Sequence, residues 1–224
     1  HEVALAFVNA FSNTPKQTGG KGILDSMGDS IRLIVYGFLL SSLIAVPLGI
    51  VCGTYSALSR LNEPFVEFFR YLPAPAFGAL AVAVLGIYEG PKVAIIFIGT
   101  FFQQVLVVAN TARKLDYALL EAALTLGTKP LKLLTHVVVP GILPNLYRDQ
   151  RILLGWAWTY LVVAELIGTS SGITLFITQQ ARCQNFDDVY AAILLIGVIG
   201  FGSDLLLARL ERVLFPWDRG ALND

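Results

Sequence analysis

Charged residues are scarce in this chain: Asp, Glu, Lys and Arg together make up 14% of its 224 residues. A soluble domain typically carries about 25% charged residues. Hydrophobic residues make up 55% of the chain, and its mean hydropathy is +0.68. The chain therefore has too few charges to cover a surface in water. A membrane protein is favoured over a soluble protein with a large apolar core.

Net charge is absent as well, since 16 basic residues balance 16 acidic ones. A nucleic-acid partner therefore has no electrostatic support.

The two cysteines, Cys52 and Cys183, and the two histidines, His1 and His136, form no Cys-x-x-Cys pair and no Cys/His cluster. No metal site is predicted, and no segment has the residues of a Walker sequence that would bind ATP. An intramembrane enzyme is disfavoured because it needs a nucleophile or metal constellation.

Long uncharged apolar runs are present instead. About 20 apolar residues in a helix cross the hydrocarbon core of a membrane. Three runs reach or approach that length, and two shorter ones gain it by extending past a single acidic residue. We predict an all-α membrane protein with about five transmembrane helices in this chain and one more upstream of His1. The runs are Leu33–Thr54, Leu72–Tyr88, Val93–Ala112, Ile152–Ala164 and Val189–Ser203.

Basic residues indicate the orientation of these helices. If the loop that contains Glu121 is cytoplasmic, eleven Lys and Arg residues face the cytoplasm and five face outside, as the positive-inside rule requires. The C-terminus is then cytoplasmic, and the segment before the first run lies outside. The eleven are Arg60, Arg70, Arg113, Lys114, Lys129, Lys132, Arg148, Arg151, Arg209, Arg212 and Arg219.

A short polar interruption, "EAALTLGTKPLKLLTHVVVPGILP", stands between the third and fourth runs. The stretch from Asp116 to Leu126 is rich in Ala and Leu, which favour helix, and Asp116 is a suitable N-cap. Gly127 supplies a C-terminal stop. These residues predict a helix of about three turns, too short to span, lying across the cytoplasmic end of the bundle. Pro140 and Pro144 are expected to break the backbone before the next spanning helix.

The same stretch resembles the EAA motif of ABC importer permeases: Glu-Ala-Ala, three residues, Gly, nine residues, then Ile-x-Leu-Pro. Glu121, Ala122, Ala123 and Gly127 match, and Val137-x-Val139-Pro140 stands at the last positions. Further stretches, among them "GDSIRLIVYGFLLSSLIAVPLGIVCG" and "GWAWTYLVVAELIGTSSGI", resemble the nitrate/sulfonate/taurine/bicarbonate group of these permeases. The likeness covers about residues 26–217.

The resemblance implies the type I ABC importer permease fold, with a cytoplasmic coupling helix. It implies a second permease copy, two ABC ATPase subunits that bind ATP and Mg, and an extracytoplasmic substrate-binding protein. No cofactor is expected on this chain itself. The bacterial inner membrane is the expected location, and a small anion such as nitrate, bicarbonate or a sulfonate is the expected cargo. The ATPase-coupling residues carried over are Leu119, Glu121, Ala122, Ala123, Leu126 and Gly127.

Polar and aromatic residues at membrane depth are candidates for the translocation path, because a polar side chain in hydrocarbon is costly unless it faces protein or water. Interhelical hydrogen bonding is an equal alternative for the two glutamines. Glu165 is expected to close a gate or to pair with Arg182, and the ion pair is the favoured role. The candidates are Gln103, Gln104, Trp156, Thr159 and Glu165.

The predicted organisation has three parts: an outer or interfacial segment 1–28, a transmembrane core 29–217 with a coupling loop 113–140, and a cytoplasmic tail 218–224. No Arg or Lys stands centrally in a spanning run, so the path is expected to offer hydrogen bonds and no fixed charge. A stand-alone secondary transporter or channel is the alternative, and the EAA spacing would then be coincidental.

Overall fold

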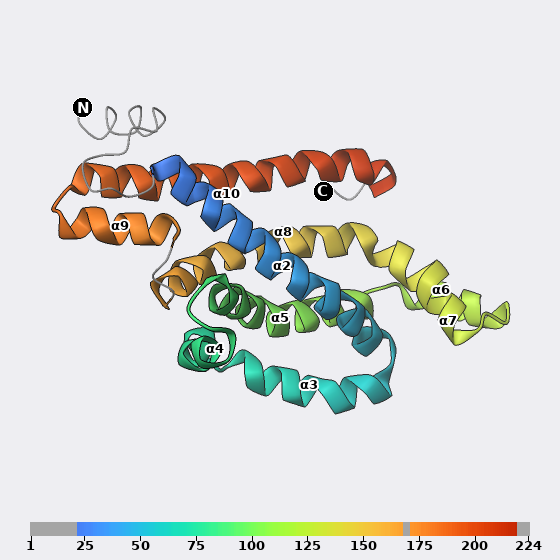
Figure 1. Cartoon of the computed structure of the whole chain (residues 1–224). Coiled ribbons are helices and arrows are strands. Elements are labelled where there is room, and N and C mark those ends of the chain that lie inside the picture. Colours follow the sequence, from blue (N-terminus) through green and yellow to red (C-terminus); the bar gives the residue numbers. More distant parts are fainter. Residues whose placement is uncertain (1–21, 168–170, 219–224) are drawn as a thin grey trace. The chain divides into compact units, whose positions relative to one another are not determined.

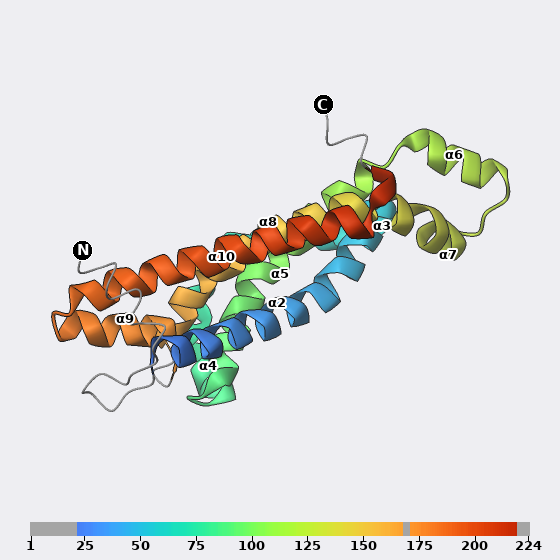
Figure 2. The ribbon, with the colours of Figure 1, turned by 90° about the horizontal axis from the view of Figure 1, so that it is seen from above.

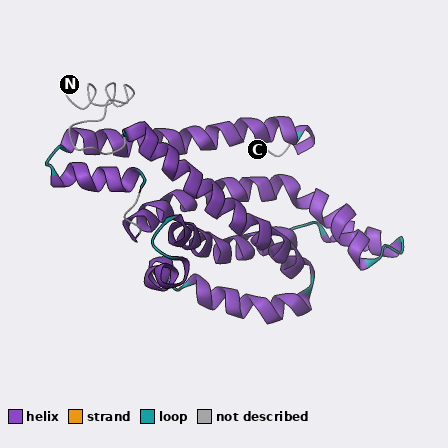
Figure 3. Cartoon of the chain, in the orientation of Figure 1, coloured by secondary structure: helices purple, strands orange, loops and turns teal. Residues whose placement is uncertain are grey.

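The computed structural model describes residues 22–167 and 171–218, and all regular structure in these ranges is helical (Figure 3). The elements run from α2 (Ile23–Thr54) to α10 (Phe186–Leu214) and are labelled in Figure 1. The predicted all-α class is confirmed. Residues 1–21 of the predicted outer segment and residues 219–224 of the predicted tail lie outside the described ranges. The helix α2 already begins at Ile23, inside the predicted outer segment.

The chain divides into two compact units, and each is described by itself. The boundaries predicted at residues 28 and 217 concern membrane topology. The two compact units do not test them, so they stay predictions. Four helices contribute residues to both units: α2, α5 (Glu89–Arg113), α8 (Val139–Ile167) and α10. Unit 1 comprises residues up to Leu39, Ala74–Phe97 and Gly155–Leu205, and unit 2 comprises Leu40–Pro73, Ile98–Leu154 and the chain from Leu206 onward.

Three of the described helices are individually long and apolar enough to cross a membrane. They are α2 with 32 residues, α5 with 25 and α10 with 29. At 1.5 Å per residue even α5 covers about 38 Å, more than the roughly 30 Å of hydrocarbon. The predicted helices Leu33–Thr54, Val93–Ala112 and Val189–Ser203 lie within them.

The predicted run Leu72–Tyr88 is not one helix. It contains the 3-10 turn η1 (Ala74–Phe77) and the eight-residue helix α4 (Gly78–Leu85), which passes as a span only together with α3 (Ser56–Arg70) across a break. Pro73 and Pro75 account for the break, because a proline lacks the N–H donor and disfavours helix at the preceding residue. The expectation of a continuous helix from Leu72 was therefore wrong.

The fourth predicted run, Ile152–Ala164, lies inside α8, which has 29 residues. That length corresponds to about 43 Å, enough to span. The helix is not among the candidate spans by composition. Its N-terminal half carries the polar sequence "NLYRDQR", residues 145–151, and this lowers its hydropathy.

The backbone is not broken at Pro140 or Pro144, contrary to prediction. The short helix α7 (Pro130–Leu133), the π-helical turn η2 (Leu134–Val138) and α8 follow one another without a gap. Pro140 is the second residue of α8 and directly follows the π turn η2, where the regular α-helical bonding is already interrupted. Pro144 lies inside α8.

Each unit has its own apolar interior. In unit 1, buried residues of α2 and α10 pack with Ile173, the first residue of α9 (Ile173–Arg182). In unit 2, one cluster joins α2, α5, η2 and α8, and we call it the unit 2 core. Leu120, a partly buried residue of the short helix α6 (Tyr117–Thr125), packs against it. The buried members of the unit 2 core are Ile50, Val108, Ala112, Val138, Ile142 and Leu146.

Two glycines let α2 and α5 approach closely in unit 2. A Cβ added at Gly53 would lie 2.5 Å from the carbonyl oxygen of Ala109 and 2.5 Å from the Cβ of Ala112. A Cβ added at Gly49 would lie 2.7 Å from the Cβ of Val108. The sequence Gly-x-x-x-Gly at 49–53 is therefore a backbone contact surface, as is common between membrane helices.

We expect Gly53→Ala to destabilise the protein by about 1–3 kcal/mol, because backbone and side-chain atoms of α5 must move to admit the methyl group. The measurement is the thermal unfolding midpoint of the purified protein in detergent. The matched control is Gly28→Ala in the same helix, where an added Cβ meets nothing within 4 Å. An equal midpoint for the two variants would contradict the close helix contact.

Candidate functional site

The predicted coupling helix is present as α6, Tyr117–Thr125, and both of its ends are formed by the residues expected. The Asp116 side chain accepts a hydrogen bond from the backbone N–H of Ala118 at 2.9 Å. Gly127 has a φ of 74°, its N–H donates to the carbonyl of Leu124, and the Thr128 N–H donates to the carbonyl of Ala123 at 3.1 Å. This pair of bonds is a Schellman motif, which ends a helix sharply at a left-handed residue.

Most of the predicted coupling residues are exposed in this chain. Leu119 is 51% exposed and Leu126 is 86% exposed, and Glu121, Ala122 and Gly127 are also exposed. Ala123 is the exception, because it is buried at 9%. The helix α6 thus has one face directed into unit 2 and another that presents a carboxylate, small side chains and leucines.

The inner face of α6 rests on a firm support. Leu120 packs against the unit 2 core, and α6 contacts both α7 and η2, beside which it lies in Figures 1 and 2. The hydroxyl of Tyr55, between α2 and α3, donates a hydrogen bond to the carbonyl of Pro130 at 3.0 Å. The coupling segment is therefore attached to unit 2 through α2 as well as through α8.

Gln104 is completely buried and joins three helices of unit 2. Its Oε1 accepts from the hydroxyl of Ser41 at 2.9 Å, and its Nε2 donates to the hydroxyl of Ser42 at 3.0 Å and to Oε1 of Gln150 at 3.4 Å. Gln104 therefore makes interhelical hydrogen bonds, which was one of the two alternatives predicted for it from the sequence; the other was lining of the translocation path. Gln103, its neighbour in α5, is only partly buried.

The other path candidates belong to unit 1, so the five do not form one described cluster. Trp156 is 48% exposed and Thr159 is exposed on α8. Both remain candidates, since an exposed residue of a single chain faces lipid, a path or a partner. The neighbouring Trp158 instead packs against the apolar interior of unit 1.

Glu165 is 2% exposed and holds the start of α9. Its carboxylate accepts hydrogen bonds from the Ser30 hydroxyl and, at 2.7 Å, from the backbone N–H of Thr174. A carboxylate there is favoured by the positive end of the helix dipole. The predicted pair with Arg182 was wrong, because Glu165 bonds Ser30 and the start of α9, whereas Arg182 ends that helix, about 13 Å along it from Ile173. The gate role stays a prediction.

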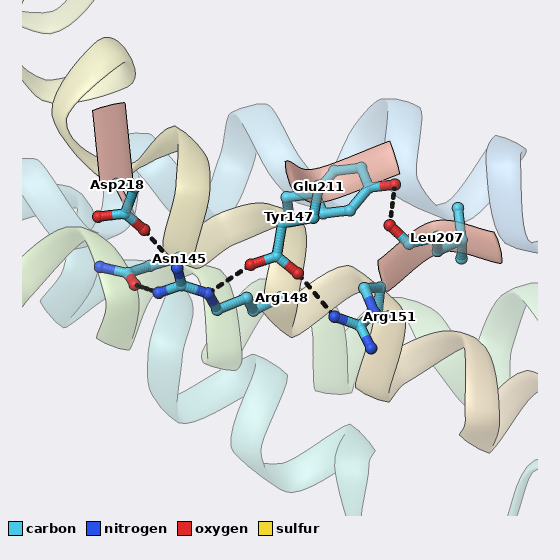
Figure 4. Close-up of polar contacts among 7 residues, drawn as sticks. All are labelled: Asn145, Tyr147, Arg148, Arg151, Leu207, Glu211 and Asp218. Carbon is cyan, nitrogen blue, oxygen red and sulfur yellow. Dashed lines mark hydrogen bonds and ion pairs between the residues drawn. The ribbon is translucent and has the colours of Figure 1, made fainter. Parts of the chain in front are cut away.

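An ion-pair network in unit 2 was not predicted from the sequence (Figure 4). Arg148 and Arg151 of α8 each donate to one carboxylate oxygen of Glu211 on α10, both at 2.6 Å. Arg148 also pairs with Asp218. The sequence did contain one indication of this network: the two arginines are three residues apart, which puts both on one face of a helix. Their acidic partners lie about 60 residues or more further along the chain, so no local sequence pattern identifies them.

The comparisons with known proteins agree with this arrangement. A family model described as "Binding-protein-dependent transport system inner membrane component" matches residues 45–215. This chain belongs to that family. The match takes in the coupling helix, all of α3 to α9, and both partners of the Arg148–Glu211 contact.

Curated relatives are named as transport permeases. The chain is 34% identical over 192 residues to a probable ABC transporter permease protein of Brucella abortus, covering 86% of this chain and 77% of the relative. It is 32% identical to the putative aliphatic sulfonates transport permease protein SsuC of Bacillus subtilis, covering 84% and 68%. It is 29% identical to the taurine transport system permease protein TauC of Escherichia coli, covering 89% and 74%.

Solved structures agree on the fold. An inward-facing structure of the MetNI methionine ABC transporter has a chain that matches with a TM-score of 0.78 at 16% identity, covering 85% of this chain and 95% of that chain. The expected type I ABC importer permease fold is therefore confirmed. At this identity the likeness concerns the fold alone.

We expect Gln104→Leu to lower stability by about 1–3 kcal/mol, because it leaves buried hydroxyl and amide groups of Ser41, Ser42 and Gln150 without this partner. The thermal unfolding midpoint in detergent measures the change. Gln103→Leu is the matched control, since it makes the same substitution at a less buried position of the same helix. Equal effects of the two variants would refute the interhelical role of Gln104.

Proposed function

We propose that this chain is the transmembrane permease subunit of an ATP-driven importer, which translocates a small anion delivered by a binding protein. The observation that carries the proposal is α6: a short capped helix that matches the EAA motif and keeps Glu121 and Leu126 exposed while Leu120 holds it to the unit 2 core. A free-standing channel or secondary transporter has no use for such a surface.

The coupling chemistry follows from the residues of α6. Glu121 can accept hydrogen bonds from a basic or hydroxyl group of an ATPase subunit. Ala122 permits close approach, and the exposed Leu119 and Leu126 add apolar contact area. Closure of an ATPase pair around ATP and Mg would move α6 and bias the bundle between two conformations.

The proposed assembly contains two copies of this chain, two ATPase subunits and an extracytoplasmic binding protein, in the bacterial inner membrane. Eleven of the 16 Lys and Arg residues fall on the side of α6, which favours a cytoplasmic α6 and C-terminus and an outer N-terminal segment. The described residues contain no group of three or more His, Cys, Asp or Glu that could hold a metal ion. As the resemblance to ABC importer permeases implies, we assign ATP and Mg chemistry to the partner subunits.

The proposed cargo class rests on relatives and on how the chain uses its cations. Relatives are named for aliphatic sulfonates, taurine and bicarbonate. Among the described residues, buried Lys92 donates to the carbonyl of Ser171 at 2.7 Å, and Arg151 is held by Glu211. Because these cations are already bonded to protein groups, we infer that the path offers an anion hydrogen bonds and no fixed charge. Selection of the anion would then rest mainly with the binding protein.

We expect Glu121→Lys to reduce both ATPase co-purification and ATP-dependent uptake about tenfold or more, since reversing a charge at a contact costs several kcal/mol. The chain should still insert and fold, because the Glu121 side chain is exposed. The same substitution at Glu67, exposed on α3, is the control. Full ATP-dependent uptake by the Glu121→Lys variant would disprove the coupling role of α6.

Substrate selection has its own test. Taurine, an aliphatic sulfonate, nitrate and bicarbonate are added separately to the purified cognate binding protein and to the purified permease, and the thermal unfolding midpoints are compared. A ligand at 100 times its dissociation constant stabilises by about 2.7 kcal/mol. We expect one of these anions to raise the midpoint of the binding protein and none to raise that of the permease. Stabilisation of the permease alone would overturn this division of roles.

A further inference from the structure

The polar segment 145–151 of α8 is fastened to the end of α10 by contacts within unit 2 (Figure 4). Glu211 uses one carboxylate oxygen for Nε of Arg148 and the other for a guanidinium nitrogen of Arg151, both at 2.6 Å. Arg148 also donates to Asn145 Oδ1 at 3.0 Å and to the carboxylate of Asp218. One acidic side chain thus holds two arginines that are one helical turn apart.

Burial and aromatic packing reinforce this contact. Glu211 is 5% exposed. The Tyr147 hydroxyl donates to the carbonyl of Leu207 at 3.0 Å, and the Tyr147 ring packs against buried Phe215 with centroids 5.7 Å apart. The fastening therefore extends over the last two turns of α10 and the residues that follow them.

The same stretch of α8 is continuous with the support of the coupling helix. Helical backbone runs from Pro130 through η2 into α8 without interruption. Leu120 of α6 packs against a core cluster that includes Val138 and Ile142. From α6 to the end of α10, each step within unit 2 is a packed or hydrogen-bonded contact.

Charge gives this fastening a property that apolar packing lacks. Burying an ion pair adds little net stability compared with well-packed apolar residues, because desolvation offsets the attraction. Charge-assisted hydrogen bonds in fixed geometry do specify one register between two helices. A carboxylate that bonds two arginines loses at least one of these bonds if α10 slides or rotates against α8.

We propose that Glu211, with Arg148 and Arg151, is a rigid joint that makes the end of α10 move as one body with the coupling helix α6. These are positioning residues: they touch neither ATP nor the transported molecule. The inference rests on the proposed function, because the displacement that the joint transmits comes from the ATPase subunits. Without the joint, movement of α6 would be taken up by slippage between α8 and α10.

The test measures a distance inside one chain of the complex with its ATPase, in which labelled permease is diluted with unlabelled permease so that only one of the two copies carries labels. Spin labels are attached at Tyr117→Cys on α6 and Val213→Cys on α10. The native side chains at these two positions are 69% and 75% exposed. The background is Cys183→Ser, since Cys183 is exposed while Cys52 is buried. Electron–electron double resonance gives the distribution of distances between the labels, without nucleotide and after trapping with ATP and vanadate.

With the joint intact we expect one narrow distribution whose mean does not change on trapping. With Glu211→Gln we expect a broadened distribution, with a mean that shifts on trapping. Arg151→Gln, which keeps the Arg148–Glu211 contact, should broaden it less and provides a milder variant if Glu211→Gln does not fold. Glu67→Gln neutralises an exposed carboxylate on α3 and should leave the distribution unchanged.

Two results would overturn the joint. One is a distribution that stays narrow in both Glu211→Gln and Arg151→Gln, even if their thermal stability falls, since the residues would then be merely stabilising. The other is movement of the two labels relative to each other in the unsubstituted protein on trapping. Failure of an ATPase to co-purify would instead refute the proposed function, and the nucleotide-free comparison of variants would still decide the joint.

Discussion

Buried polar groups in a helix bundle must find partners in the bundle, because neither hydrocarbon nor apolar side chains can replace water. This requirement governs where the few polar residues of this chain lie. Gln104, Glu165 and Glu211 are each at most 5% exposed, and each bonds groups from other helices or from the start of a helix. In a chain with 14% charged residues, these contacts fix registers that apolar packing alone leaves loosely defined.

The three groups act at different places. In unit 1, Glu165 fixes the start of α9, and Gly172 is required there because a Cβ would collide with the carboxyl group. In unit 2, Gln104 ties α5 to α2 and α8, and Glu211 ties α8 to α10. The helix α6 packs through Leu120 against the unit 2 core, which is built from α2, α5, η2 and α8. The proposed coupling needs such stiffness, since a surface helix could move a bundle only if the intervening contacts did not yield.

Local chemistry predicted the coupling helix closely. Its cap, its Ala- and Leu-rich body and its glycine stop act within a few residues, so sequence alone specifies them, and the structure differs from the prediction by one residue at each end. Uncharged length likewise predicted α2, α5 and α10. The expected path through Gln103, Gln104, Trp156, Thr159 and Glu165 stays a prediction, because a path depends on partner chains and conformations that no residue pattern encodes.

Failures of prediction came from non-local contacts and from proline context. The partner of Glu165 is a backbone N–H of α9 together with Ser30, 135 residues away, and no local pattern pointed to it. The acidic partners of Arg148 and Arg151 were missed for the same reason. Prolines were misjudged in both directions: those near residue 74 interrupt a span, whereas Pro140 and Pro144 are accommodated in α8.

The π-helical turn η2 has a consequence for the direction in which α6 points. A π turn holds more residues than an α turn, and η2 joins α8 to the segment that supports α6. Because a π turn takes up one extra residue, deleting one residue there would let the turn relax to α geometry and would leave the helix on either side in nearly the same orientation. The same deletion in the regular part of α8 would instead rotate everything before it by about 100° around the helix axis, with a shift of about 1.5 Å. The π turn is thus the one described place between α6 and α8 where the chain can lose a residue without turning the surface of α6 to another side.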